Sequence, residues 1–257
     1  MNPFRLIGRA VLGVCETVGE LTMFGVRAVA AGVVGPYYPR QIVRQLLDIG
    51  YYSLPVVGLT AIFTGMVLAL QSFTGFSRFQ AESAIPTIVI VSLTRELGPV
   101  LAGLMVAGRV GAAMAAELGT MRVTEQIDAL TTLATDPLRY LVFPRLIAGV
   151  LMLPALVLVA DIIGALGGYL VSVYKLGFNS TGYINSTFQY LEAQDVTAGL
   201  VKAAVFGFLV ALMGAYQGYN SKGGAQGVGS ATTRAVVTAS ILILTADYMV
   251  TEIFFSR

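Results

Sequence analysis

The feature that most constrains this chain is a set of long apolar runs without charged residues. The first covers residues 49–77, and its 29 residues exceed the roughly 20 that a helix needs to cross the hydrocarbon core of a bilayer. Residues 203–221 form a second uncharged run, and 146–174 and 235–251 each contain a single aspartate. Residues 83–108 are apolar except for the adjacent pair Arg95 and Glu96. These runs predict five transmembrane helices, at about 52–74, 84–107, 147–172, 200–219 and 235–254.

Composition indicates the same class of protein, an all-α integral membrane protein. Charged residues make up 12% of the 257 residues, about half the roughly 25% of a soluble domain, and hydrophobic residues make up 56%. The net charge of +2 gives no reason to expect a nucleic-acid partner. One cysteine and no histidine exclude a disulfide framework, a Cys/His zinc site and a catalytic triad that needs histidine. We therefore expect no metal site and no catalytic residues.

Residues 1–48 are expected to form two helices outside the membrane core, ahead of a single transmembrane domain at 49–257. The first would be an interfacial amphipathic helix, because five charges fall on one side of it: Arg5, Arg9, Glu16, Glu20 and Arg27. The alternatives are a signal peptide, which the two glutamates disfavour, and a sixth span, which the five charges disfavour. A short elbow helix is expected near 38–51, where Arg40, Arg44 and Asp48 recur every four residues.

Basic residues set the expected orientation of the chain. With the N-terminus in the cytoplasm, 11 of the 16 Lys and Arg residues fall on the cytoplasmic side. Four fall outside, and these are Arg78, Lys175, Lys202 and Arg257. Because cytoplasmic loops carry the excess of Lys and Arg, this distribution predicts a cytoplasmic N-terminus and a C-terminus on the opposite side of the membrane.

A nucleotide-binding motif is missing from the sequence. There is no G-x-x-x-x-G-K-[ST] segment, and no lysine follows a glycine. We therefore expect neither an ATPase site nor a cofactor in this chain, which would not itself be an enzyme. Any work that the protein performs would draw its energy from a partner protein or from an ion gradient.

The segment 108–139, between the second and third spans, predicts a short cytoplasmic helix at about 123–131. Thr124 is expected to cap a helix that starts at Glu125, with Asp128 one turn later. The helix would also have an apolar side, made of Val123, Ile127 and Leu130. Acidic and apolar faces together suit docking to another protein. The alternative is a solvated helix that only connects two spans.

Several motifs of the chain resemble the MlaE family of permeases. They are Arg95-Glu-Leu-Gly-Pro-Val, Ala107-Gly-Arg-Val-Gly, Ala116-Glu-Leu-Gly-Thr-Met-Arg-Val-Thr-Glu-Gln-Ile-Asp-Ala-Leu, Asp136-Pro-Leu-Arg-Tyr, Pro144-Arg and Ala231-Thr-Thr-Arg-Ala-Val-Val. The resemblance covers essentially the whole chain, and the stretch 117–130 is its longest and most specific part.

The resemblance implies the permease subunit of an ABC transporter that moves phospholipids between the bacterial inner membrane and a periplasmic lipid carrier, maintaining outer-membrane lipid asymmetry. The implied assembly is a homodimer on two cytoplasmic ABC ATPases, which would hold ATP and Mg. A hexameric ring of MCE-domain proteins would lie on the periplasmic side, with a STAS-domain subunit bound to the ATPase. The helix at 123–131 would then be the coupling helix of the permease domain, and its polar contacts with the ATPase would be Glu117, Arg122, Glu125 and Asp128.

Charges inside the predicted spans suggest where a lipid would bind. A charge near the bilayer centre costs roughly 2.5–3.5 kcal/mol on insertion scales, so such residues usually pair or line a polar cavity. Given the resemblance, Arg95 and Glu96 would line a cavity for a phospholipid head group, with the guanidinium on the phosphate. The alternative is a structural pair with Asp161, Asp247 or the backbone. Four residues are expected either on the acyl-chain side of the cavity or as interfacial anchors: Leu68, Phe73, Phe76 and Phe79.

Two other functions are compatible with the residues alone. An ion- or proton-coupled secondary transporter could use Glu96, Asp161 and Asp247 as carriers, but five spans without a visible inverted repeat disfavour it. A membrane scaffold could dock cytoplasmic proteins through residues 109–145. The resemblance favours the ABC permease over both.

Overall fold

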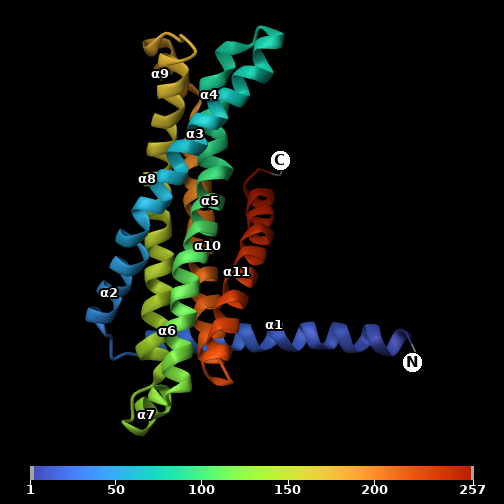
Figure 1. Cartoon of the computed structure of the whole chain (residues 1–257), viewed down its shortest axis with the longest axis vertical. Helices are drawn as coiled ribbons and strands as arrows, with labels where there is room; N and C mark the ends of the chain where they lie inside the picture. The colour runs from blue at the N-terminus through green and yellow to red at the C-terminus, as the bar shows by residue number, and fades with distance from the viewer. Residues whose placement is uncertain (1–2, 256–257) are drawn as a thin grey trace.

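The computed structural model describes residues 3–255, and their side chains apart from those of residues 3–11 and 14. Within that range the chain is helical, without a strand. Five stretches are long and apolar enough to cross a membrane: Pro39–Phe79, Glu82–Val123, Leu138–Tyr174, Ala193–Tyr219 and Gly224–Phe255. They form one elongated bundle (Figure 1). The prediction of an all-α integral membrane protein with five spanning helices is confirmed.

The first two spans are longer than the apolar runs that predict them. In the first, the elbow helix α2 (Pro39–Ile49) leads through a short turn into α3 (Leu54–Phe76). In the second, α4 (Ile85–Ser92), α5 (Gly98–Val106) and α6 (Ala112–Val123) are joined by two π-helical segments, Leu93–Leu97 and Ala107–Gly111. Arg109 therefore lies within a helix and not in a loop. It binds the α2 end of the first span, donating to the carbonyl of Asp48 at 3.1 Å and to Ser53 Oγ at 2.8 Å.

Glycines bring the helices at the centre of the bundle into backbone contact. α8 (Phe143–Tyr174) packs between α3 and α10 (Ala193–Tyr219). A Cβ atom added to Gly65 of α3 would lie under 3.0 Å from the backbone of Gly164 of α8, and one added to Gly149 of α8 would meet the carbonyl of Gly207 of α10 at 2.5 Å. In lipid, where apolar burial does not drive association, such close approach supplies the packing energy.

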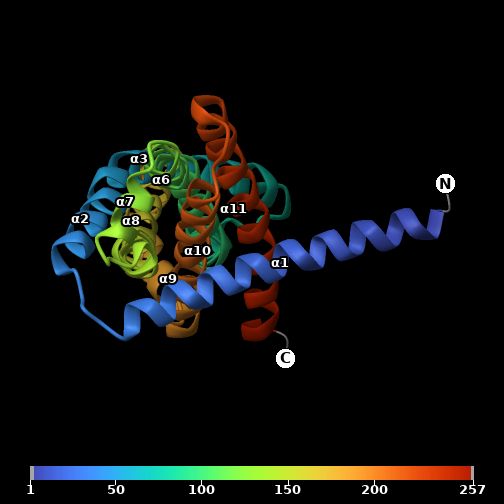
Figure 2. The same ribbon diagram turned by 90° about the horizontal axis from the view of Figure 1, so that it is seen from below.

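The N-terminal helix α1 (Pro3–Val33) runs crosswise under one end of the bundle and extends beyond it (Figures 1 and 2). Ala28 is fully buried against the bundle, and Leu21 and Phe24 pack beside it. Near its C-terminal end, Arg139 Nε donates to the carbonyl of Ala31 at 2.7 Å. This crosswise orientation agrees with an interfacial helix. The predicted charges Arg5 and Arg9 lie outside the described side chains, as Arg257 lies outside the described residues.

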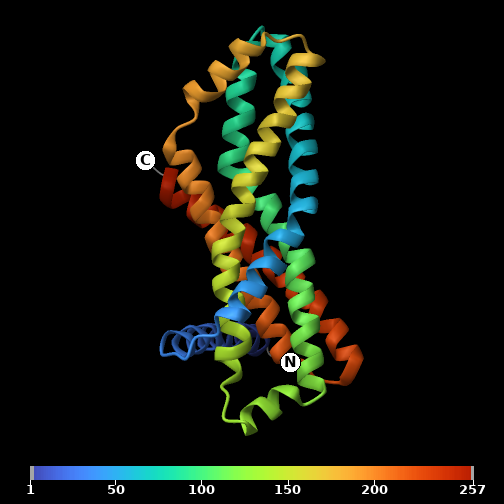
Figure 3. The ribbon, with the colours of Figure 1, turned by 90° about the vertical axis from the view of Figure 1, so that its left-hand side faces the viewer.

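Two short helices mark the opposite ends of the bundle. α7 (Gln126–Thr132) lies at the end that α1 crosses, between α6 and α8, and α9 (Ser180–Tyr190) lies at the other end (Figure 3). The last helix, α11 (Gly224–Phe255), ends part-way along the bundle, short of α9 (Figure 1). Its C-terminal turns therefore meet α10 and the second span inside the bundle, where the charged residues gather.

Candidate functional site

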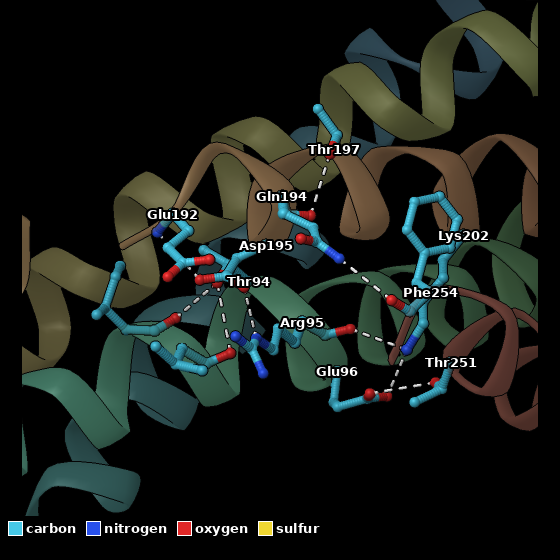
Figure 4. Close-up of polar contacts among 12 residues, drawn as sticks. Thr94, Arg95, Glu96, Glu192, Gln194, Asp195, Thr197, Lys202, Thr251 and Phe254 are labelled. Carbon is cyan, nitrogen blue, oxygen red and sulfur yellow. Dashed lines mark hydrogen bonds and ion pairs between the residues drawn. The ribbon is translucent and has the colours of Figure 1, made fainter. Parts of the chain in front are cut away.

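A π-helical segment carries the two predicted intramembrane charges. Arg95 and Glu96 lie in Leu93–Leu97, and the same segment contains the buried Leu93 and Thr94. π-Helical turns are rare and are found frequently at functional sites. The segment directs Arg95 toward the start of α10 and Glu96 toward α11, so the two neighbours in sequence bind different partners (Figure 4).

Arg95 is held by the N-terminus of α10. Its Nε donates to Asp195 Oδ1 at 2.6 Å, and its guanidinium lies 4.5 Å from the centre of the Phe255 ring. The Asp195 side chain is fully buried. Its second oxygen accepts from the backbone N–H of Glu192 at 3.1 Å, in a reciprocal capping box. One carboxylate therefore both starts α10 and binds Arg95.

Lys202 connects the second, fourth and fifth spans. Its fully buried side chain donates to Glu96 Oε2 at 2.6 Å and to the carbonyl of Arg95 at 3.0 Å. The same Nζ forms an ion pair with Asp247 of α11 at 2.9 Å, without the alignment of a hydrogen bond. Thr251 of α11 donates to Glu96 Oε1 at 3.2 Å. One ammonium group thus pairs with both carboxylates.

These residues form one connected group, the ionic cluster, which consists of Arg95, Glu96, Asp195, Lys202 and Asp247. It holds two cations and three carboxylates, so an ionised cluster is anionic by one charge. Arg95 is still 35% exposed. No hydrogen bond is formed by its terminal guanidinium nitrogens to any residue that the structure describes. These terminal nitrogens can bind an anionic group such as a phosphate, while the other residues of the cluster remain paired.

The predicted acyl-chain residues do not gather around Arg95. Leu68 and Phe73 pack in a separate small core with Ala69 and Val89, and Phe73 stacks edge-on against Phe178 with ring centres 6.2 Å apart. Phe76 and Phe79 are exposed, by 36% and 79%. Their position near the end of α3 is compatible with either expectation, and a lipid role for all four stays a prediction.

The sequence analysis did not identify two members of the cluster, Asp195 and Lys202. The count of basic residues placed Lys202 on the outer side of the membrane, whereas its side chain is fully buried among the helices, within α10. The error arose because the apolar run starts only after Lys202, whereas the helix starts at Ala193. The spacing of Asp195 and Lys202 could have revealed that both belong to one helix. Seven residues are two helical turns, which place an acid and a base on the same side of one helix.

At the α7 end, the predicted helix start is also wrong. Thr124 does not cap α7, because α6 continues to Val123 and the Thr124 hydroxyl donates back to the carbonyl of Thr120 at 2.9 Å. The chain reverses at Glu125, which has a positive φ of 60°, and α7 begins at Gln126. The reason is that the second span continues as a helix well beyond its apolar run, so Thr124 stands at a helix end.

The predicted docking residues divide between two environments. Ile127 is buried and anchors α7 to the bundle, while Glu125 and Asp128 are exposed. Arg122 of α6 forms an exposed ion pair with Asp128 at 2.6 Å. Glu117 of α6 is also partnered: its Oε2 accepts from Arg145 Nη2 at 2.7 Å, and Arg145 is only 3% exposed. α7 therefore presents an acidic polar face outward, and its apolar side is used for packing.

The comparisons with known proteins decide the family. The family model described as Permease MlaE matches residues 42–253. This chain belongs to the MlaE permease family. It is thus a multi-pass membrane protein and the permease subunit of an ABC transporter, as the resemblance predicted. Membership decides against the alternatives of an ion-coupled secondary transporter and a scaffold.

Relatives of this MlaE-family permease cover nearly its whole length. A probable ABC transporter permease protein of Rickettsia felis is 60% identical, covering 99% of this chain and 98% of that protein. The intermembrane phospholipid transport system permease protein MlaE of Haemophilus influenzae is 34% identical over the same shares. The chloroplastic protein TRIGALACTOSYLDIACYLGLYCEROL 1 of Arabidopsis thaliana is 37% identical, covering 86% of this chain and 63% of that protein.

Proposed function

We propose that this permease moves phospholipids between the bacterial inner membrane and a periplasmic lipid carrier made of MCE-domain proteins, and so maintains outer-membrane lipid asymmetry. The observation that carries the proposal is the end-to-end match to the Haemophilus influenzae protein, whose name states intermembrane phospholipid transport. The partly exposed Arg95 side chain supports the proposal, because its guanidinium is a phosphate-binding group within an apolar bundle.

The α7 end is proposed as the docking surface for a cytoplasmic ABC ATPase, which would bind ATP and Mg. Glu125, directly before α7, and Asp128 of α7 are exposed, while Ile127 fixes the helix to the bundle. Because α1 lies at the same end, this assignment also places the N-terminus in the cytoplasm (Figure 3). α9 then lies on the periplasmic side, where a hexameric MCE-protein ring would meet the permease.

Reversing the two exposed acids tests the docking surface. In the variant with Glu125→Lys and Asp128→Lys, we expect the ATPase to be lost from the purified complex while the permease still inserts into the membrane. The matched control is Glu16→Lys with Glu20→Lys, which reverses two exposed acids on α1. Equal recovery of the ATPase with both double variants would contradict docking at α7.

Arg95→Lys tests the head-group contact without unpairing Asp195. A lysine keeps the charge for Asp195 but loses the fork that matches phosphate oxygens. We expect fewer phospholipids per chain, by mass spectrometry, in the purified Arg95→Lys complex and fewer still in Arg95→Ala. Arg78→Lys, at an exposed position, is the control. Unchanged lipid together with lower thermal stability would assign Arg95 to helix packing alone.

We also propose that the permease acts as a homodimer, with a STAS-domain subunit on the ATPase. α11 supports a second copy, because only 11% of its most apolar 18-residue stretch is buried within the chain. Its exposed row includes Val237, Ile241, Leu244 and Tyr248. Purification from the native membrane, followed by mass spectrometry of proteins and lipids, tests the whole assembly. A complex without a P-loop ATPase or without phospholipid would overturn the proposed function.

A further inference from the structure

The second span is interrupted where it passes the ionic cluster. The backbone N–H of Gly98 donates to the carbonyl of Leu93, five residues earlier, and the next residue, Pro99, has no N–H. The carbonyls of Thr94 and Arg95 therefore lose the donors that a regular helix supplies four residues later. Inside a membrane, each such carbonyl needs another partner.

α10 meets both of these carbonyls. Gly199 lies so close to the Thr94 carbonyl that a Cβ atom added to the glycine would be under 3.0 Å from that oxygen. One turn later in α10, the ammonium of the fully buried Lys202 donates to the Arg95 carbonyl at 3.0 Å (Figure 4). Lys202 therefore supplies the hydrogen bond that Pro99 cannot.

Residues 93–99, here called the hinge segment, have the features that allow a helix to bend. Sharp bends occur at proline, at π-helical turns and where a side chain inserts into the ladder of backbone hydrogen bonds. The hinge segment combines all three. In addition, the Thr94 hydroxyl donates to the carbonyl of Ile90 at 2.9 Å, and such a bond from a threonine to the preceding turn often bends a helix.

The hinge segment separates two parts of the second span that pack against different neighbours. On one side of it, α4 packs against α3, α8 and α9. On the other side, α6 packs against α10 and α11 and leads into α7 (Figure 3). A change of bend in the hinge segment would therefore move the α9 end of the bundle relative to the α7 end.

We propose that residues 93–99 are a hinge of the permease and that Lys202 is the latch that holds this hinge in its present conformation. When the Lys202 ammonium leaves the Arg95 carbonyl, the second span is free to bend at Pro99. The hinge depends on the proposed function for one point only, which is that an ATPase bound at the α7 end supplies the motion. The latch itself acts without nucleotide.

The distance between two spin labels, one on each side of the hinge segment, tests the proposal. The labels are attached to Ser83→Cys, ahead of α4, and Thr197→Cys, in α10, which are both exposed positions. The chain also carries Cys15→Ser, because Cys15 is its only cysteine. The complex with all its subunits is measured by pulsed electron paramagnetic resonance, with labelled chains diluted by unlabelled ones. An arm of about ten residues is roughly 15 Å long, so a change of about 20° in bend moves its end by about 5 Å.

Removing the hydrogen bond and then replacing it tests the latch, without nucleotide. Lys202→Met should shift or broaden the distance distribution by about 5 Å. Adding Pro99→Ala should return the distribution toward that of the wild type, because alanine restores the missing N–H. The matched control adds Pro154→Ala, which restores an N–H in α8, a helix without a π-helical interruption at that point, and it should not return the distribution. A wild-type distribution in Lys202→Met, or an equal return in both double variants, would overturn the latch.

Pro99→Ala alone tests the hinge, and it decides even if Lys202→Met does not fold. Without nucleotide, we expect a narrower distance distribution than in the wild type, whereas Pro154→Ala should keep the wild-type width. With ATP and orthovanadate, the wild-type distance should change by about 5 Å, and Pro99→Ala should reduce that change.

Two results would show that residues 93–99 are a fixed kink and not a hinge. One is an unchanged wild-type distance in a complex that hydrolyses ATP, and the other is an unchanged width in Pro99→Ala. A complex without an ATPase would overturn the proposed function instead, and the measurements without nucleotide would still decide on the hinge.

Discussion

The ionic cluster and the α7 end use the same kinds of side chain in opposite ways. In the cluster, Lys202 and Asp195 are fully buried and are bound to residues about a hundred positions away or on another span. At the α7 end, Arg122 and Asp128 are six positions apart, and both are exposed. Burial strengthens the cluster's electrostatics and makes each unpaired charge costly, whereas solvent screens the exposed pair. The cluster should therefore determine stability, and the α7 charges should determine binding.

Removing the central cation of the cluster should have the largest effect on stability. Lys202→Met keeps the length of the side chain but leaves Glu96 and Asp247 facing each other unpaired, so we expect a loss of about 3–5 kcal/mol in unfolding free energy. The measurement is unfolding of the purified complex in one detergent. Lys222→Met, at an exposed position near the end of α10, is the control. Equal stability of the two variants would mean that the ionic cluster does not stabilise the fold.

Removing the partner of Arg95 should have an intermediate effect. Asp195→Asn keeps an acceptor for the capping hydrogen bond but removes the charge from the ion pair, and a hydrogen bond to a charged group contributes about 1.5–3 kcal/mol. Glu192→Gln, which changes an exposed acid of the same cap, should stay within about 0.5 kcal/mol of the wild type. The same unfolding measurement applies. A larger loss with Glu192→Gln would assign the effect to the cap and not to Arg95.

Much of the fold was predictable, because five apolar runs have only one satisfactory structure in lipid, the helix. The ends of the helices were not predictable in the same way. α6 leaves the apolar run and continues to Val123, and α10 starts at Ala193, before its apolar run. Hydropathy indicates which residues lie in the hydrocarbon core of the membrane. How far a helix continues beyond those residues depends on local helix propensity and capping. The position of Thr124 and the burial of Lys202 were missed for this one reason.

The candidate site was predictable in its residues but not in its partners. Arg95 and Glu96 stood out because a charge within a span needs compensation. Their partners depend on how the second span is rotated against α10 and α11, and the π-helical segment Leu93–Leu97 changes that rotation from the regular helical value. By contrast, Glu125 and Asp128 lie three residues apart at the start of α7, so their shared exposure follows from short-range spacing.

Breaking the exposed ion pair at the α7 end should have the smallest effect on stability. Arg122→Gln removes the partner of Asp128, and an exposed ion pair contributes only about 0–1 kcal/mol. We expect near-normal unfolding, with the small remaining difference reduced at high salt because exposed charges are screened. Since Asp128 stays exposed and becomes free to bind another cation, ATPase recovery should fall less in this variant than in Glu125→Lys with Asp128→Lys. A loss of stability as large as that of Lys202→Met would show that the α7 charges hold the fold and are not reserved for a partner.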